Sequence, residues 1–219
     1  MLAIRRLLWL WTTLACSGEV VDRIAVTVGS NVITDGEIRL QIRIAALLDR
    51  KQPDLSAPER RKAAERMVDQ MLLLREEDGS RFPEPAMTDI VQELAGFQKD
   101  HYSNEAELQH DLQERQIPED DLRRYLQVQL RTLRFIEFRF RAGVQVTEQE
   151  MQTYYQKEFL PSWKEKDPAR KEKDPPPFDQ VSSDIEEILI SRQVDANTEE
   201  WLAQARKLTP VRYREEAFR

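Results

Sequence analysis

The chain is poor in the residues that most often build metal and nucleophile centres. Its 219 residues include one cysteine, Cys16, and two histidines, His101 and His110. A single cysteine cannot form a disulfide within the chain, and a cysteine–histidine zinc site needs about four ligands at close spacing. Neither histidine lies near a nucleophile motif. We therefore expect no catalytic residues, no metal site and no cofactor.

Glycine and net positive charge are also scarce. The six glycines are isolated from one another, which disfavours a turn-rich all-β fold and excludes a glycine-rich phosphate loop. The formal net charge is -7. A nucleic-acid-binding protein needs a basic face that displaces counterions from phosphates. The composition therefore predicts no nucleic-acid partner.

The first 17 residues resemble a secretory signal peptide. A short basic stretch, Arg5–Arg6, precedes an apolar run, Leu7–Leu14, that is too short to span a bilayer. Small residues follow from Ala15 to Gly18, as signal peptidases require. We expect export with removal of residues 1–17 and no transmembrane span in the mature chain. A lipid anchor on Cys16 and a retained N-terminal anchor are the alternatives.

Alternating β-branched residues predict two short strands at the start of the mature chain. The segment 20–28 (VVDRIAVTV) is followed by a polar turn and by Val32–Ile33, which resumes the extended pattern. Two strands alone are only marginally stable, so another element must cover them. The extended segment 210–213 (PVRY) is a candidate third strand.

Most of the remaining chain has helical periodicity. Capping boxes at Thr34, Ser56 and Thr147, each with a glutamate three residues later, predict three helix starts. The long helix that begins near Pro118 has apolar stripes on two sides, which predicts a position at the centre of the domain. The expected fold class is mainly α, a multi-helix core with a small β-sheet of the N-terminal strands and the C-terminal strand.

Composition also predicts the domain organisation. The segment 161–177 (PSWKEKDPARKEKDPPP) alternates charges, contains five prolines and has Trp163 as its only large apolar residue. Such a segment buries too little apolar surface to offset the entropy of ordering, so we expect a flexible loop. The expected units are a signal peptide (1–17), a helical domain (18–160), this loop (161–177) and a helix and strand that pack back on the core (178–219).

Flexible and aromatic apolar side chains are the remaining functional signal. Methionine-rich and aromatic surfaces can repack around varied partners, although any single residue of these types belongs more often to an ordinary core. The candidate residues for contact with polypeptide clients are Met67, Met71, Met87, Phe97, Tyr102, Tyr154, Tyr155 and Trp163.

The order of these elements resembles that of the SurA-type periplasmic chaperones, the family of the SurA N-terminal domain. The similar segments are VVDRIAVTVGSNVITDGEIRLQI (20–42), MVDQMLL (67–73), Glu107–Leu112, the long helix, Val146–Met151, and the closing segment with Trp201. In that family, parvulin-type isomerase domains are inserted between the sixth and the last helix. Here the short segment 161–177 occupies that place, so a parvulin domain is lacking.

The resemblance implies a chaperone core without an isomerase. Such a core holds unfolded polypeptides, among them those destined for the outer membrane, in the periplasm and without ATP. We therefore expect a protein that is not an enzyme. The alternatives are a parvulin-related peptidyl-prolyl isomerase and an envelope assembly subunit with one fixed partner.

Overall fold

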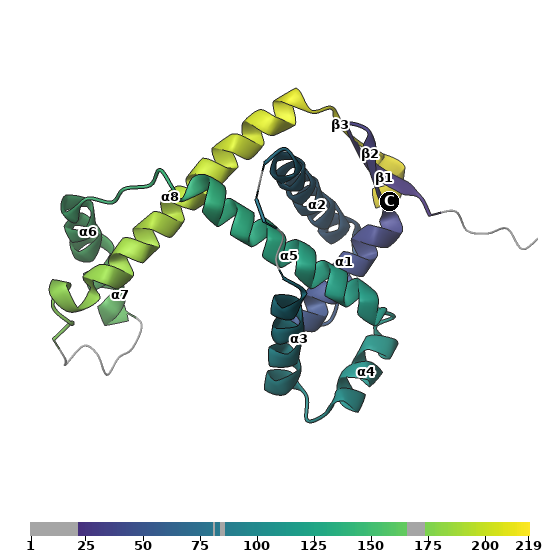
Figure 1. Ribbon diagram of the computed structural model, residues 1–219, viewed down its shortest axis with the longest axis horizontal. Helices are drawn as coiled ribbons and strands as arrows, with labels where there is room; N and C mark the ends of the chain where they lie inside the picture. The colour runs from purple at the N-terminus through teal and green to yellow at the C-terminus, as the bar shows by residue number, and fades with distance from the viewer. Residues whose placement is uncertain (1–21, 81, 84–85, 166–173) are drawn as a thin grey trace, which may run out of the picture.

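The computed structural model describes residues 22–80, 82–83, 86–165 and 174–219, and this part of the chain is mainly helical with one small sheet (Figure 1). The expected fold class is confirmed. The expected signal peptide, residues 1–17, lies outside the described residues. In chain order the elements are β1 (Ile24–Val28), β2 (Asn31–Thr34), α1 (Asp35–Leu48), α2 (Ala57–Asp78), α3 (Met87–His101), α4 (Glu105–Glu114), α5 (Glu119–Phe140), α6 (Glu148–Tyr154), the π-helical turn η1 (Tyr155–Phe159), α7 (Leu160–Glu165), α8 (Phe178–Leu208), β3 (Val211–Tyr213) and the 3-10 turn η3 (Glu215–Phe218).

The three strands form an antiparallel sheet in the order β2-β1-β3. Val28 of β1 pairs with Asn31 of β2 on one side and with Val211 of β3 on the other. The third strand predicted from the C-terminal segment is therefore confirmed. Because β1 lies in the middle, the sheet joins the N-terminal hairpin to the segment that follows α8.

The first core lies between the sheet, α1 and α2. Val26, Ile38 and Val68 are fully buried in it. The capping box at Thr34 turns the chain from β2 into α1, because the Thr34 Oγ1 accepts the Glu37 N–H at 3.2 Å and the Glu37 Oε2 accepts the Thr34 N–H at 2.8 Å. Two of the orphan N–H groups at the helix start are satisfied in this way.

The capping box expected at Ser56 is wrong. The Ser56 side chain accepts no hydrogen bond from the first turn of α2. The Asp54 carboxylate accepts the Ser56 N–H at 2.8 Å, which is the N–H that Glu59 would bind in a capping box. Glu59 forms an ion pair with Lys62 instead.

Helix α5 crosses the middle of the molecule and contacts α1, α2, α3 and α8 (Figure 1). Its predicted central position is confirmed, and Phe135 is fully buried. Each apolar stripe has a fully buried member, Leu122 in one and Phe135 in the other, but the packing of both stripes is incomplete, because Leu133 is 59% exposed and Phe138 is 58% exposed. The neighbouring helices cover the sides of α5 that hold Leu122 and Phe135. They leave the side chains of Leu133 and Phe138 at the surface.

After α5 the chain forms a separate lobe from α6, η1, α7 and the first part of α8 (Figure 1). Helix α8 has 31 residues and runs from this lobe back to β3. Residues 161–165, expected in a loop, are helical in α7. The Trp163 ring stacks on the Phe159 ring with centroids 5.9 Å apart, and this contact extends the helix beyond residue 160. Residues 166–173 of the expected loop lie outside the described part.

A buried arginine joins the C-terminal segment to the first core. Arg60 of α2 is 5% exposed. Its Nη1 donates to the Asp35 Oδ1 at 2.7 Å and to the carbonyl oxygen of Ala217 at 2.6 Å, and its Nη2 donates to the carbonyl oxygen of Arg219 at 3.2 Å. One side chain thus holds α1, α2 and η3 together.

Replacement of Arg60 by alanine should destabilise the fold. The change leaves two backbone oxygens without their donor, and we expect the free energy of unfolding to fall by about 2–3 kcal/mol. This loss is smaller than for breaking a fully buried ion pair, because Asp35 keeps its ion pair with Arg39. Urea denaturation measures this loss. The matched control is Arg66→Ala, at an exposed position of the same helix. Equal losses in both variants would contradict the anchoring role of Arg60.

The same network predicts a stability that depends on pH in acid. Burial opposes ionisation of Asp35, but hydrogen bonds from Arg39 and Arg60 outweigh it and lower the pKa of Asp35 below 3.8. A carboxylate with a lowered folded-state pKa stabilises the fold above its unfolded pKa, and this contribution is lost as the pH falls through the folded value. The stability difference between the wild type and Asp35→Asn should therefore be constant near neutral pH and shrink below about pH 3.8. Denaturation over a pH series checks this, and a difference that grows in acid would refute it.

Candidate functional site

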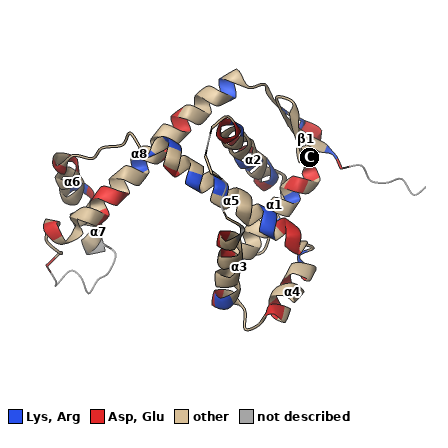
Figure 2. Cartoon of the chain, in the orientation of Figure 1, with Lys and Arg blue, Asp and Glu red and all other residues tan. Residues whose placement is uncertain are grey.

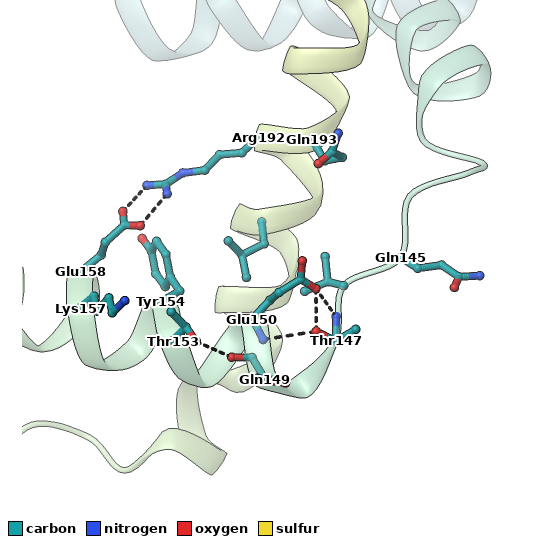
Figure 3. A pocket seen from close by; sticks show the side chains of 12 residues that line it. Gln145, Thr147, Gln149, Glu150, Thr153, Tyr154, Lys157, Glu158, Arg192 and Gln193 are labelled. Carbon is teal, nitrogen blue, oxygen red and sulfur yellow. Dashed lines mark hydrogen bonds and ion pairs between the residues drawn. The ribbon is translucent and has the colours of Figure 1, made fainter.

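A cleft of about 670 Å³ lies between α6 and α8, in the lobe that follows α5 (Figure 3). One wall is formed by the segment 145–158, which comprises the approach to α6, α6 itself and most of η1. The other wall is formed by Leu189, Arg192 and Gln193 of α8. We call this feature the α6–α8 cleft.

The lining of the α6–α8 cleft combines two kinds of side chain. The apolar members Val146, Tyr154 and Leu189 are half-buried. The amide-bearing members of the lining are exposed. These amide-bearing residues are Gln145, Gln149 and Gln193.

A capping box fixes one end of the cleft. The Glu150 Oε2 accepts the Thr147 N–H at 2.8 Å, and the Thr147 Oγ1 accepts the Glu150 N–H at 3.3 Å (Figure 3). The capping box predicted at Thr147 is therefore confirmed. The hydrogen bonds from the Thr147 side chain and backbone lower the pKa of Glu150, so this carboxylate stays ionised and keeps the start of α6 in place.

An ion pair bridges the cleft at its other end (Figure 3). Arg192 of α8 meets Glu158 of η1 through two parallel contacts, Nη1 to Oε1 at 3.1 Å and Nη2 to Oε2 at 2.8 Å. The hydrogen bond lowers the pKa of Glu158 and raises the pKa of Arg192. The Arg192 guanidinium also lies 4.9 Å from the centre of the Tyr154 ring. Both charged groups are exposed, so the pair sets the geometry of the cleft more than the stability of the fold.

Aromatic stacking holds the π-helical turn beside the cleft. The Tyr155 ring stacks on the Phe159 ring with centroids 5.4 Å apart, and the edge of the Tyr155 ring meets Phe178 of α8 at 5.6 Å. The Tyr155 hydroxyl donates to the carbonyl oxygen of Pro176 at 2.8 Å. Tyr155 is therefore part of the small core of the lobe, whereas its neighbour Tyr154 lines the cleft. π-Helical turns occur frequently at functional sites.

A second surface runs along α2. Two clefts of about 270 Å³ each share Met67 and Gln70 in their linings. One lies between α2 and Asn31 at the tip of the hairpin and includes Met71, and the other lies between α1, α2 and Tyr125 of α5. We call this pair the α2 groove. Methionine side chains are flexible, so the groove can adapt to different contacts.

Three of the predicted client-binding residues line these surfaces. Met67 and Met71 line the α2 groove, and Tyr154 lines the α6–α8 cleft. Tyr155 and Trp163 stabilise the lobe instead, through their contacts with Phe159.

Phe97 and Tyr102 do not line either surface. Phe97 and Tyr102 pack against each other, with ring centroids 5.7 Å apart, beside the core between α1, α4 and α5. The Tyr102 hydroxyl donates to the Asp111 Oδ2 at 2.7 Å. Burial and this bond raise the pKa of Tyr102 to about 12. Met87 begins α3, and its side chain lies outside the described part of the structure.

The polar residues of the α6–α8 cleft were not predicted from the sequence. A search for flexible and aromatic apolar residues cannot find glutamines such as Gln149 and Gln193. Arg192 and Glu158 lie on different helices, so no helical spacing connects them. The capping signal at Thr147 predicted the start of α6, and Tyr154 was the one lining residue that residue type had marked as a candidate.

Residues 22–80, 82–83, 86–165 and 174–219 contain no group of three or more histidine, cysteine, aspartate or glutamate side chains that could hold a metal ion. Of the helices in this part of the chain, none combines the length and the apolar character needed to cross a bilayer.

Loss of the capping box should loosen α6 and the cleft wall that it forms. Replacement of Thr147 by alanine removes a cap worth about 1 kcal/mol. Local opening of α6 then costs about 1 kcal/mol less free energy. We therefore expect hydrogen exchange of the α6 amides to become about fivefold faster. The control is Thr153→Ala in the same helix, whose hydroxyl donates to the carbonyl oxygen of Gln149. Unchanged exchange in Thr147→Ala would show that the cap does not hold the wall.

No family model and no curated protein matches this chain. The geometry of the two surfaces, together with the sequence pattern, is therefore the basis for a functional proposal.

Proposed function

We propose that this protein is an ATP-independent chaperone that holds unfolded polypeptides. The observation that supports this most directly is the α6–α8 cleft, whose lining combines exposed glutamines with a half-buried apolar group. A cleft of about 670 Å³ has the size of typical ligand sites and can hold a few residues of an extended peptide.

The lining suits a polypeptide of varied sequence. An extended backbone presents N–H donors and C=O acceptors at every residue. A glutamine amide offers both an acceptor oxygen and two donor hydrogens, so Gln149 can bind such a backbone whatever its side chains are. The Gln193 Nε2 donates to the Asn197 Oδ1 at 2.9 Å, which leaves the acceptor oxygen and one donor hydrogen of Gln193 for the same purpose. Leu189 and Tyr154 can contact the apolar side chains between these backbone groups. A holding chaperone needs this combination of tolerance and apolar contact.

Exposed apolar groups elsewhere add further contact area. Leu133 and Phe138 on the central helix α5 are each more than half exposed. The α2 groove adds Met67 and Met71. An unfolded client that is long enough could contact several of these surfaces at once, which raises its overall affinity.

The cellular setting of the proposal comes from the sequence. The expected signal peptide at residues 1–17 favours export, and the SurA-like order of elements favours the periplasm and clients destined for the outer membrane. We propose this setting together with the chaperone function, and we expect no prolyl isomerase activity.

Aggregation of an unfolded client tests the function. A urea-denatured outer-membrane porin is diluted into buffer without ATP, with and without the full mature chain, and light scattering is recorded. We expect suppression at stoichiometric amounts. Leu189→Asn should weaken it by removing apolar contact in the cleft, whereas Ser191→Asn, at an exposed position on the same helix outside the cleft lining, should not.

Two results would contradict the proposal. One is the absence of protection for several different unfolded clients. The other is turnover above background in a protease-coupled assay on a proline peptide, which would favour the isomerase alternative. Circular dichroism of both variants ensures that a loss of protection does not come from unfolding.

A further inference from the structure

The charged side chains that line the α6–α8 cleft are divided unevenly between its two ends. Glu150 lies at the end that the capping box fixes, and Lys157, Glu158 and Arg192 lie at the other end (Figure 3). We call these last three residues the cationic end of the cleft, because two cations meet one carboxylate there. The rest of the lobe shows both signs of charge on its helices (Figure 2).

Pairing at the cationic end leaves one positive charge over. Glu158 and Arg192 neutralise each other through their two parallel contacts. Lys157 is exposed, lines the cleft and has no ion-pair partner among the described residues. This end of the cleft is therefore positive, although the formal net charge of the chain is -7. A positive group beside an apolar surface attracts a carboxylate.

The ion pair between Glu158 and Arg192 is one that a ligand can exchange. The Arg192 side chain is 53% exposed and the Glu158 side chain is 51% exposed. An exposed ion pair contributes little to stability, so breaking it costs little. A guanidinium group is a planar fork that binds a carboxylate through two parallel hydrogen bonds. Glu158 thus occupies at Arg192 the position that a carboxylate of a bound chain can take.

The apolar part of the cleft adjoins this exchangeable pair. The Arg192 guanidinium lies 4.9 Å from the centre of the Tyr154 ring, and Leu189 precedes Arg192 by about one turn of α8. A bound carboxylate and a bound apolar side chain would therefore come from neighbouring residues of an extended segment.

We propose that the α6–α8 cleft selects extended polypeptide segments in which an aspartate or glutamate lies beside an apolar residue. This specificity rests on the proposed chaperone function and names its preferred client class. The acidic side chain meets Lys157 and replaces Glu158 at Arg192. The neighbouring apolar side chain contacts Leu189 and Tyr154. Glu158 is then a competitor within the protein, and it limits the affinity for such segments.

The opposite end of the cleft restricts where the acidic residue can lie. The Glu150 Oε2 accepts the Thr147 N–H and the Thr147 hydroxyl, and the negative charge of Glu150 remains at that end. A segment with carboxylates on both sides of its apolar centre would bring one of them to Glu150, where like charges repel. The preferred segment therefore has its acidic residue on one side of the apolar centre.

Labelled peptides with blocked ends test the preference directly. Three short peptides begin with Leu-Val-Leu and continue with two glutamates, two serines or two lysines, and fluorescence anisotropy measures their binding to the full mature chain. Two exposed charge contacts should make the glutamate peptide bind about fivefold more tightly than the serine peptide, and this ratio should shrink at high salt. The negative net charge of the chain favours the lysine peptide instead, so a preference for lysine or equal binding would overturn the proposal.

A matched pair of lysine variants assigns the preference to the cleft. Lys157→Gln should weaken binding of the glutamate peptide about threefold and leave the serine peptide unchanged. The control Lys207→Gln removes the same charge from an exposed position in the last turn of α8, outside the cleft lining, and should retain the preference. Equal effects of both variants would overturn the assignment.

A second pair of variants tests the exchange at Arg192, with the opposite sign. Glu158→Gln removes the competing carboxylate and should tighten binding of the glutamate peptide about threefold. The control Glu148→Gln removes the same charge from an exposed position of α6 that does not line the cleft, and it should have a smaller effect. Equal gains in both variants, or weaker binding in Glu158→Gln with an unchanged circular dichroism spectrum, would overturn the exchange.

The outcomes also distinguish this specificity from the chaperone function. If the glutamate and serine peptides bind equally while aggregation is suppressed, the specificity is wrong and the chaperone function stands. If aggregation is suppressed but no peptide binds, the cleft is not the contact site and the specificity is again wrong. If neither occurs, both proposals fail.

Discussion

The pairing of β3 with β1 is the contact on which the arrangement of the molecule depends. It ties the end of α8 to the N-terminal hairpin, so the helix is fixed to the first core at that end. Arg60 reinforces the same junction from α2 by binding the carbonyl oxygens of Ala217 and Arg219. With one end held in this way, the 31 residues of α8 reach across α5 to the lobe and contribute one wall of the cleft there (Figure 1).

The side chains that stabilise the fold and the proposed binding cleft therefore lie in different parts of the molecule. The sheet, α1 and α2 bury most of the first core, and the lobe has its own small aromatic core around Tyr155 and Phe159. The cleft between α6 and α8 therefore does not have to be filled by side chains for the fold to be stable. Its exposed glutamines and its half-buried apolar group stay available to a partner, which fits a protein that holds other chains.

Local sequence signals predicted the elements well and the site poorly. The strand alternation, the capping boxes at Thr34 and Thr147, and the third strand near residue 211 depend on short-range rules, and the structure confirms them. At Ser56 the same rule failed because Asp54 competes for the N–H. The exposure of Leu133 and the helical state of residues 161–165 depend on tertiary packing, which periodicity and composition do not determine. The cleft combines residues from two helices that are far apart in sequence, so residue type alone found only Tyr154 among its lining.

Site-specific crosslinking is the most direct test of the claim that the α6–α8 cleft contacts unfolded polypeptides. A photo-reactive amino acid is placed at Gln193 in the cleft wall and, as a control, at Gln92, which is exposed on α3. Each protein is irradiated with a denatured outer-membrane porin during dilution from urea. The account predicts adducts from position 193 and few or none from position 92. Equal yields at both positions, or no adduct at position 193 while aggregation is suppressed, would contradict it.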